Sequence, residues 1–407
     1  MIKKTFIGLT AIILLLIVFN YQKIIKLYHT ICLFDKEVII HNFQHMDEVY
    51  DTKSIPASSQ PISYPVHKSH QLIDSFYFGD SLFLVENFFN HTNTEGFLIL
   101  HRDTIIFEEY YRGLKPSTTH ISWSMAKSVV ATLAGIAWDA GLFQLEDPIT
   151  DYLPQFIDTG YDGVRIKDIL QMSSGVGFNE DYGDFNSDIN RFGRAFALGS
   201  SFEEFAKSLK RVREPGTYCH YVSMDTQVIG MLIAQITGKS LTEYLIEKLW
   251  EPLGMEYPAE WLIDNTGTEL ALGGLNMTLR DYAKLGQLYL HKGFFLGKQL
   301  VSPEWVEKAT TPDAPHLMPG KHGLSSNNLG YGFQWWIPEF PQGDFFAAGI
   351  YNQYIYVHPL KELVIVKLSA NHQFKKQGAI TKDIHIAMFQ TMAEKFPELS
   401  LMTVINI

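Results

Sequence analysis

The stretch at residues 124–141 reads SMAKSVVATLAGIAWDAG. It opens with a Ser-x-x-Lys motif and continues as an Ala- and Val-rich run before Gly141, which predicts a helix from about Ser124 to Ala140. The run is too apolar for a helix on the protein surface. Residues three apart share one face of a helix, so we expect Lys127 to stand beside the Ser124 hydroxyl.

This motif has the chemistry of nucleophilic catalysis. A serine at a helix N-terminus lies among unsatisfied backbone N–H groups, which can stabilise the oxyanion of acyl transfer. A lysine held among apolar neighbours loses its proton more readily, which suits Lys127 to accept or relay the proton of Ser124. Taken alone, the four residues are explained equally well by a helix-capping serine beside a surface lysine.

The segments on either side of the motif predict the rest of the fold. Their order predicts an α+β fold, an α/β sandwich in which an antiparallel β-sheet is flanked by N- and C-terminal helices and carries an inserted, mainly helical lobe at about 142–300. The predicted strands are 96–101, 104–111, 345–348, 353–358 and 362–368, and the main predicted helices besides 124–140 are 226–237, 278–291 and about 380–395.

Composition narrows the class of protein. The chain has 407 residues, of which 46% are hydrophobic, as in a folded globular protein. Its formal net charge of −11 argues against nucleic acid as a partner, because a phosphate backbone requires a dense basic face. Two cysteines, Cys32 and Cys219, are too few for a disulfide framework. The sequence contains no C-x-x-C or H-E-x-x-H motif, and we expect no metal site.

Two further motifs follow Ser124 in the chain. Residues 214–226 contain Tyr221-Val-Ser223, and residues 346–353 read FAAGIYNQ. With these motifs the chain resembles the serine β-lactamase and penicillin-binding-protein superfamily, and within it the class C-like esterases and 6-aminohexanoate-dimer hydrolases. Other stretches similar to this family follow in the expected order over about 75–395: 141–148, 151–154, 169–175, 273–281 and 331–336.

The resemblance implies a β-lactamase/transpeptidase-like fold and a serine hydrolase that cleaves an ester or amide of a small substrate through an acyl-enzyme on Ser124. It implies that Lys127 and Tyr221 form the proton-transfer pair, with Tyr221 as the base in acylation. Which of these two groups holds the proton at rest is left open. The backbone N–H groups of Ser124 and Ile350 are implied as the oxyanion hole. Acyl transfer through serine needs no metal or organic cofactor, and none is expected.

Substrate contacts are implied less directly. The residues implied to bind substrate are Tyr182, Ser223, Asn276, Ala347 and Gly349. For Tyr182 and Asn276, packing within a loop is nearly as good an explanation. Ala347 stands where penicillin-recognising members have a Lys or His that holds a substrate carboxylate, so carboxylate binding is not expected unless an Arg elsewhere replaces it. We expect an apolar cleft shaped by aromatic residues: Trp335, Trp336, Phe346 and Tyr351.

Two alternatives stay open for the function. The first is a D,D-peptidase or β-lactamase that acts on cell-wall peptides or β-lactams, which Ala347 and Ser223 both disfavour. The second is a non-catalytic, membrane-tethered binding module on the same fold. That module is expected to have lost part of its catalytic set, whereas Ser124, Lys127 and Tyr221 are all present.

The N-terminus has the pattern of a membrane anchor. Lys3 and Lys4 precede an apolar run at residues 5–19, which predicts an uncleaved single-pass helix with a cleaved signal peptide as the alternative. We expect it to hold the catalytic domain on the periplasmic or extracytoplasmic side of a bacterial cytoplasmic membrane. The predicted units are an anchor or signal segment at 1–26, a membrane-proximal segment at 27–74 and the β-lactamase-like domain at 75–400.

Overall fold

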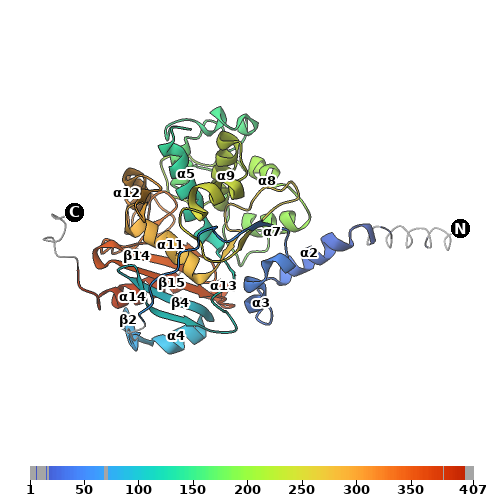
Figure 1. Cartoon of the computed structure of the whole chain (residues 1–407). Helices are drawn as coiled ribbons and strands as arrows, with labels where there is room; N and C mark the ends of the chain where they lie inside the picture. Colours follow the sequence, from blue (N-terminus) through green and yellow to red (C-terminus); the bar gives the residue numbers. More distant parts are fainter. Residues whose placement is uncertain (1–5, 7–14, 16–17, 68–71, 379, 399–407) are drawn as a thin grey trace.

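A seven-stranded antiparallel sheet forms the base of the molecule in the computed structural model, which describes residues 6, 15, 18–67, 72–378 and 380–398 (Figure 1). The strand order is β11-β12-β13-β14-β15-β4-β5, so the first long strands of the chain pair with the last. The strands are β4 (Thr94–His101), β5 (Thr104–Tyr110), β11 (Gly330–Tyr331), β12 (Trp336–Ile337), β13 (Phe345–Gly349), β14 (Gln353–His358) and β15 (Leu363–Ser369).

Both faces of this sheet are covered. Successive side chains of a strand point to opposite faces, and in β14 Ile355 and Val357 join one apolar core while Tyr354 and Tyr356 join a second. Helix α11 (Leu279–Leu290) packs on the first face. The second core includes residues of α4 (Val85–His91) and α14 (Ile380–Ala393). The predicted α+β fold, an antiparallel sheet between helices, is confirmed.

The inserted lobe is built around a buried helix, α5 (Ala126–Asp139), which packs against α9 (Ser223–Thr237). Gly238 ends α9 in the left-handed conformation at φ 65°, as its position in the sequence predicts. Around this pair lie five further helices: α6 (Ile166–Leu170), α7 (Asp188–Ala197), α8 (Phe202–Ser208), α10 (Leu241–Leu245) and α12 (Pro303–Thr310).

A second sheet crosses the lobe, and the sequence did not predict it. Its antiparallel order is β1-β7-β8-β6, and none of its strands exceeds four residues. Strands this short carry too few residues to show an alternating pattern. The four strands are β1 (Thr52–Ile55), β6 (His120–Ile121), β7 (Ala259–Leu262) and β8 (Leu275–Met277). The remaining elements are small: β2 (Ser75–Phe78), β3 (Ser81–Leu84), β9 (Phe294–Phe295), β10 (Lys298–Gln299) and α13 (Phe374–Gln377).

The segment ahead of the sheet folds onto the lobe through α2 (Tyr21–Cys32) and α3 (Ile39–Gln44) (Figure 1). Helix α2 contacts α7, and Leu33 and Phe43 are buried in the same apolar core as Ile355 and Val357 of β14. Among the described residues, no helix is long and apolar enough to cross a membrane. Most of the predicted anchor at residues 1–26 lies outside the described residues.

We expect the packing of α11 on the sheet to depend on Gly286. A Cβ atom there would lie 2.5 Å from Val364 Cγ1 and 2.9 Å from Ile355 Cγ2. Because the helix and sheet would have to separate, Gly286→Val should lower the free energy of unfolding by about 1–3 kcal/mol, measured by urea denaturation. Gly323→Val is the matched control, since a Cβ there meets no atom within 4 Å, and its change should stay within about 0.5 kcal/mol. Equal losses in both variants would contradict this account.

Candidate active site

Ser124 lies in a tight turn, the one-turn helix η2 (Trp123–Met125), directly before α5. Trp123 has a φ of 44°, in the left-handed region that bulky residues rarely adopt, at a cost of about 1–3 kcal/mol. The rings of Phe34 and Phe43 pack against the Trp123 indole, with ring centres 5.6 and 5.5 Å from it. The N-terminal segment therefore supports the strained turn that presents Ser124.

Lys127 is placed as the spacing of the motif predicts. Its Nζ donates a hydrogen bond to Ser124 Oγ at 3.1 Å and another to the carbonyl of Leu272, and the residue is 1% exposed. Burial lowers the pKa of Lys127 to about 7, although the negative charges of Glu180 and Asp225 oppose this shift. Near neutral pH, a large fraction of Lys127 is therefore the neutral amine that can accept a proton.

Tyr221 completes this group of three residues. Lys127 Nζ lies 5.3 Å from the centre of the Tyr221 ring, and Trp336 stacks on the same ring at 5.3 Å. Burial raises the pKa of Tyr221, and a hydrogen bond with Ser124 only partly offsets this effect. The sequence left open which group holds the proton at rest. In the structure, burial favours a neutral phenol on Tyr221 and a readily deprotonated amine on Lys127.

Strand β13 approaches this turn very closely. A Cβ on Gly349 would lie 2.3 Å from the carbonyl oxygen of Ser122, so only glycine allows this approach. Ile350 follows Gly349 directly and faces the same cavities as Ser124. The structure thus brings together the two residues whose backbone N–H groups are expected to form the oxyanion hole.

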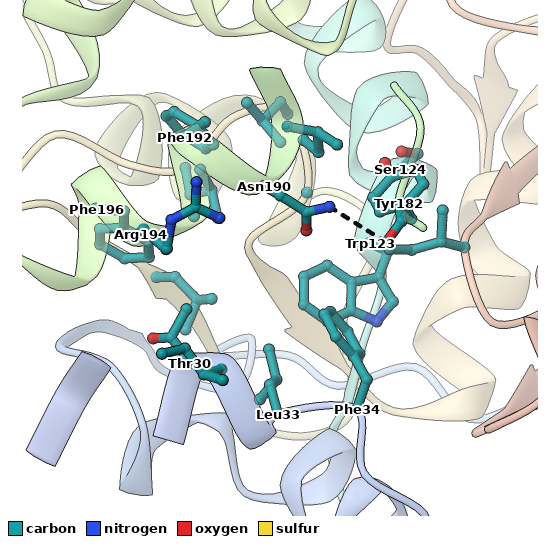
Figure 2. A pocket seen from close by; sticks show the side chains of 18 of the residues that line it. Thr30, Leu33, Phe34, Trp123, Ser124, Tyr182, Asn190, Phe192, Arg194 and Phe196 are labelled. Carbon is teal, nitrogen blue, oxygen red and sulfur yellow. Dashed lines mark hydrogen bonds between the residues drawn. The ribbon is translucent and has the colours of Figure 1, made fainter. Parts of the chain in front are cut away.

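Two cavities meet at Ser124. The first, named here the Tyr221 cavity, has a volume of about 350 Å³, and its walls include Tyr221, Trp336, Ala348 and Lys382. The second, named the Phe34 pocket, has a volume of about 240 Å³ and extends from Ser124 toward α2 and α7 (Figure 2). Both cavities are bordered by Ser124, Tyr182, Gly183, Ile350 and Lys375.

Two of the residues expected to bind substrate lie at these cavities. Tyr182 borders both, and Gly349 borders the Tyr221 cavity. Ala347 does not border either cavity, because it points into the core on the opposite face of β13, and Ala348 faces the Tyr221 cavity instead. The expectation for Ala347 is therefore wrong by one residue of strand register.

Ser223 and Asn276 do not border the cavities. Ser223 begins α9, its backbone N–H donates to Glu180 Oε1 at 2.6 Å, and its Oγ is buried without a hydrogen-bond partner in the described part of the chain. Asn276 lies in β8 and donates to the carbonyl of Gly274. Asn276 therefore serves the second sheet, and the expectation that it lines the cleft is wrong.

The expected apolar cleft exists, but most of its walls come from other residues. Of the four aromatic residues that we expected to shape it, Trp336 borders the Tyr221 cavity, whereas Trp335, Phe346 and Tyr351 are fully buried in the cores. The apolar walls of the Phe34 pocket include Leu33, Phe34, Trp123, Phe185, Phe192 and Leu272. Two of these residues precede the family-like part of the chain.

Charged residues of the site were also missed in the sequence, Glu180 and Lys382 among them. Glu180 accepts hydrogen bonds from the Ser223 N–H and from the Tyr182 hydroxyl at 3.0 Å, and its charge raises the pKa of Lys127. Its position two residues before Tyr182 was the only available signal. Lys382 enters the Tyr221 cavity from α14 with Nζ 4.2 Å from the centre of the Trp336 ring. The Tyr221 cavity therefore does contain a cation, which comes from α14 and not from the position of Ala347 in β13.

Comparison with known proteins agrees with this geometry. A family model described as Beta-lactamase matches residues 94–386. The 6-aminohexanoate-dimer hydrolase of Paenarthrobacter ureafaciens is 29% identical over 318 residues, which cover 75% of this chain and 81% of that protein.

Solved structures share the fold. One from Bacillus anthracis, described provisionally as a 6-aminohexanoate-dimer hydrolase, has a TM-score of 0.80 at 24% identity and covers 90% of this chain and 97% of its own. EstCE1, described as a hydrolase with promiscuous acyltransferase activity, has a TM-score of 0.59 at 15% identity and covers 75% of this chain and 96% of its own.

The rate at which Ser124 reacts should depend on pH. Because Lys127 has a pKa of about 7 and only its neutral form accepts a proton, we expect the labelling rate with a fluorophosphonate to rise as pH increases through about 7. Intact mass against time, at a series of pH values, measures this rate. Lys127→Met should lower the rate by about 100-fold or more and remove the step.

Glu180→Gln is a second test that Lys127 is the group that titrates. Since the charge of Glu180 raises the pKa of Lys127, its removal should move the midpoint of the pH profile to lower pH. Glu304→Gln, on the exposed face of α12, is the control and should leave the midpoint in place. A flat profile in the wild type, or an upward shift in Glu180→Gln, would exclude Lys127 as the titrating group.

Proposed function

The chain belongs to the beta-lactamase family, and we propose that it is a serine hydrolase that cleaves an amide or ester of a small substrate through an acyl-enzyme on Ser124. The observation that carries this proposal is the 3.1 Å hydrogen bond between Lys127 Nζ and Ser124 Oγ in a buried site. A serine hydroxyl is a weak nucleophile until a neighbouring base removes its proton.

Acylation follows from the placement of the three side chains. Because burial favours a neutral phenol on Tyr221, we assign the base in acylation to Lys127 in place of Tyr221. The Lys127 amine accepts the proton of Ser124 as Oγ attacks the substrate carbonyl, and the backbone N–H groups of Ser124 and Ile350 stabilise the oxyanion. When the tetrahedral intermediate collapses, Tyr221 donates its phenolic proton to the leaving nitrogen or oxygen. Tyr221 recovers a proton from the Lys127 ammonium, so the first product leaves neutral.

Deacylation uses the same groups in reverse. A water molecule attacks the acyl carbon, Lys127 accepts its proton, and the proton returns to Ser124 Oγ as the ester bond breaks. A neutral phenol is suited to amides in particular, because an amine leaves only after it gains a proton. The relative named 6-aminohexanoate-dimer hydrolase supports amides as substrates.

We also propose that the chain is held at a membrane by its N-terminal segment. The apolar run at residues 5–19 after Lys3 and Lys4 supports an anchor. Helix α2 follows it and exposes apolar side chains, with Tyr28 64% and Ile31 56% exposed. The anchor would place the catalytic domain outside the cytoplasm.

Loss of the nucleophile should abolish activity. Wild type treated with a fluorophosphonate is expected to gain the mass of one adduct, and Ser124→Ala none, while hydrolysis of p-nitrophenyl acetate falls by about a thousandfold or more. Ser117→Ala, an exposed serine just before the turn, is the control and should keep both signals. A folded wild type that gains no adduct would favour the non-catalytic module.

Cell fractionation tests the anchor. The full chain should sediment with membranes, resist extraction by high salt and be released by detergent, because an apolar helix partitions into the bilayer. A variant that lacks residues 1–19 should stay in the supernatant. Full-length protein recovered from the supernatant would contradict the anchor, and an intact mass lacking the N-terminal segment would identify it as a cleaved signal peptide.

A further inference from the structure

Helix α2 carries apolar side chains on a face that is turned away from the protein. Tyr21, Ile24, Tyr28 and Ile31 follow one another at spacings of three and four residues, which places them on one side of a helix. Their exposed fractions are 60%, 46%, 64% and 56%, respectively. We name these four residues the outer stripe. In a helix on the surface of a soluble domain, the outward side is expected to be polar instead.

The face of α2 that meets the domain includes polar groups. Lys26 Nζ donates to Asp51 Oδ2 at 2.7 Å and lies 5.8 Å from the centre of the Tyr50 ring. Thr30 shares a hydrogen bond of 2.8 Å with the Tyr50 hydroxyl. Lys26, Leu27 and Thr30 are all half-buried on this side, where α2 contacts α7. The amphipathic pattern of α2 is therefore inverted: two of these three inward residues are polar, and the outer stripe is apolar.

The length and the start of α2 restrict how such a helix can meet a membrane. Asn20 has φ −110° and ψ 12°, outside the helical range, so α2 begins as a separate helix after the apolar run at residues 5–19. Its 12 residues span about 18 Å, whereas the hydrocarbon core of a bilayer is about 30 Å thick. Lys23 and Lys26 also lie within it. Helix α2 can therefore lie along a membrane surface but cannot cross the membrane.

The outer stripe has the composition of a membrane–water interface. Two of its residues are tyrosines, whose rings favour the level of the lipid headgroups, and two are isoleucines, which favour the acyl chains below. Charge does not provide the attraction, because the chain has a formal net charge of −11 and Lys26 is paired with Asp51. The expected partner is therefore the apolar edge of a phospholipid bilayer, whatever the charge of its headgroups.

The Phe34 pocket opens beside the outer stripe. Ile31 belongs to the stripe and also borders this pocket. Figure 2 shows Thr30 and Leu33 along the same side of the pocket. Phe185, which borders the pocket as well, is 62% exposed. Bordering residues that are more than half exposed lie at the mouth of a pocket, so contact between the stripe and a bilayer would place this mouth at the membrane surface.

We propose that α2 lies in the interface of a phospholipid bilayer, with the outer stripe toward the acyl chains, and that it holds the mouth of the Phe34 pocket at the membrane surface. The inward groups Lys26 and Thr30 attach the helix to the domain. The inference rests on the membrane attachment proposed above and adds the surface that contacts lipid and the orientation of the catalytic domain.

Fluorescence quenching measures the depth of each face of α2. Full-length protein with Cys32→Ser is placed in phosphatidylcholine vesicles and carries a polarity-sensitive dye at Tyr28→Cys or at Gln22→Cys. Cys219 is 2% exposed and should stay unlabelled. Gln22 is an exposed residue of the same helix, about 120° around the axis from Tyr28. Part of the phosphatidylcholine carries a spin label on its acyl chain, near the headgroup.

We expect the dye at Tyr28→Cys to emit at shorter wavelength and to lose about half of its intensity or more, and the dye at Gln22→Cys to lose much less. High salt should not change this result, because the contact is apolar. A helix that continued from the anchor straight into water would give the reverse order, since Gln22 is nearer to the anchor. That order would overturn the proposal.

A matched pair of substitutions tests the outer stripe itself. Ile24→Asp places a charge on the stripe and should reduce the quenching at Tyr28→Cys by about twofold or more. Ile157→Asp changes an isoleucine of similar exposure outside α2, 52% against 46%, and should leave the quenching unchanged. Labelling of Ser124 by a fluorophosphonate shows that both variants are folded. Equal quenching in the two variants would contradict the role of the stripe.

Flotation of the vesicles separates this inference from the attachment on which it rests. A protein that floats, but whose dye at Tyr28→Cys emits as in water, would overturn the inference and leave the attachment standing. A dye that emits at shorter wavelength but is not quenched by the spin-labelled lipid would show that a second copy of the chain covers the stripe, which also overturns it. A protein that does not float would overturn both.

Discussion

The site depends on the burial of the Lys127 amine beside the Ser124 hydroxyl. Lys127 can lower its pKa toward neutrality only if water is kept from its Nζ, and α5 achieves this because it follows directly on the turn of Ser124 and is buried against α9 inside the lobe. The sheet contributes β13, whose Gly349 permits close contact with that turn. The packing of the sheet, the lobe and the N-terminal segment around this turn therefore sets the protonation state of Lys127.

The strained backbone beside Ser124 is supported by residues of the N-terminal segment. Trp123 adopts a left-handed backbone conformation, and such conformations persist only where the surroundings hold them. Here the support comes from Phe34 and Phe43, and Phe34 also stacks on Tyr351 at 4.4 Å, which directly follows Ile350 in the chain. A single aromatic cluster thus connects both sides of the expected oxyanion hole.

The sequence predicted well those parts that depend on local pattern. Helix α5, strands β13 to β15 and the proximity of Lys127 to Ser124 follow from periodicity and spacing. The sequence failed where the position of a residue depends on distant parts of the chain. The four strands β1, β6, β7 and β8 are too short to show a hydrophobic period. Ala347 was expected at the cavity, but Ala348 lies there, because a shift of one residue exchanges the two faces of a strand. Lys382 reaches the site from α14, which no spacing rule connects to Ser124.

The origin of Phe34 has a consequence for how such proteins diversify. The residues that perform the chemistry lie within the 94–386 stretch that matches the family model, whereas Leu33 and Phe34 precede it. A change at Leu33 or Phe34 can therefore alter which molecules the pocket accepts while the groups around Ser124 stay in place. Two proteins with identical catalytic motifs can in this way differ in the shape of the pocket beside the serine, and a comparison restricted to the shared domain would not distinguish them.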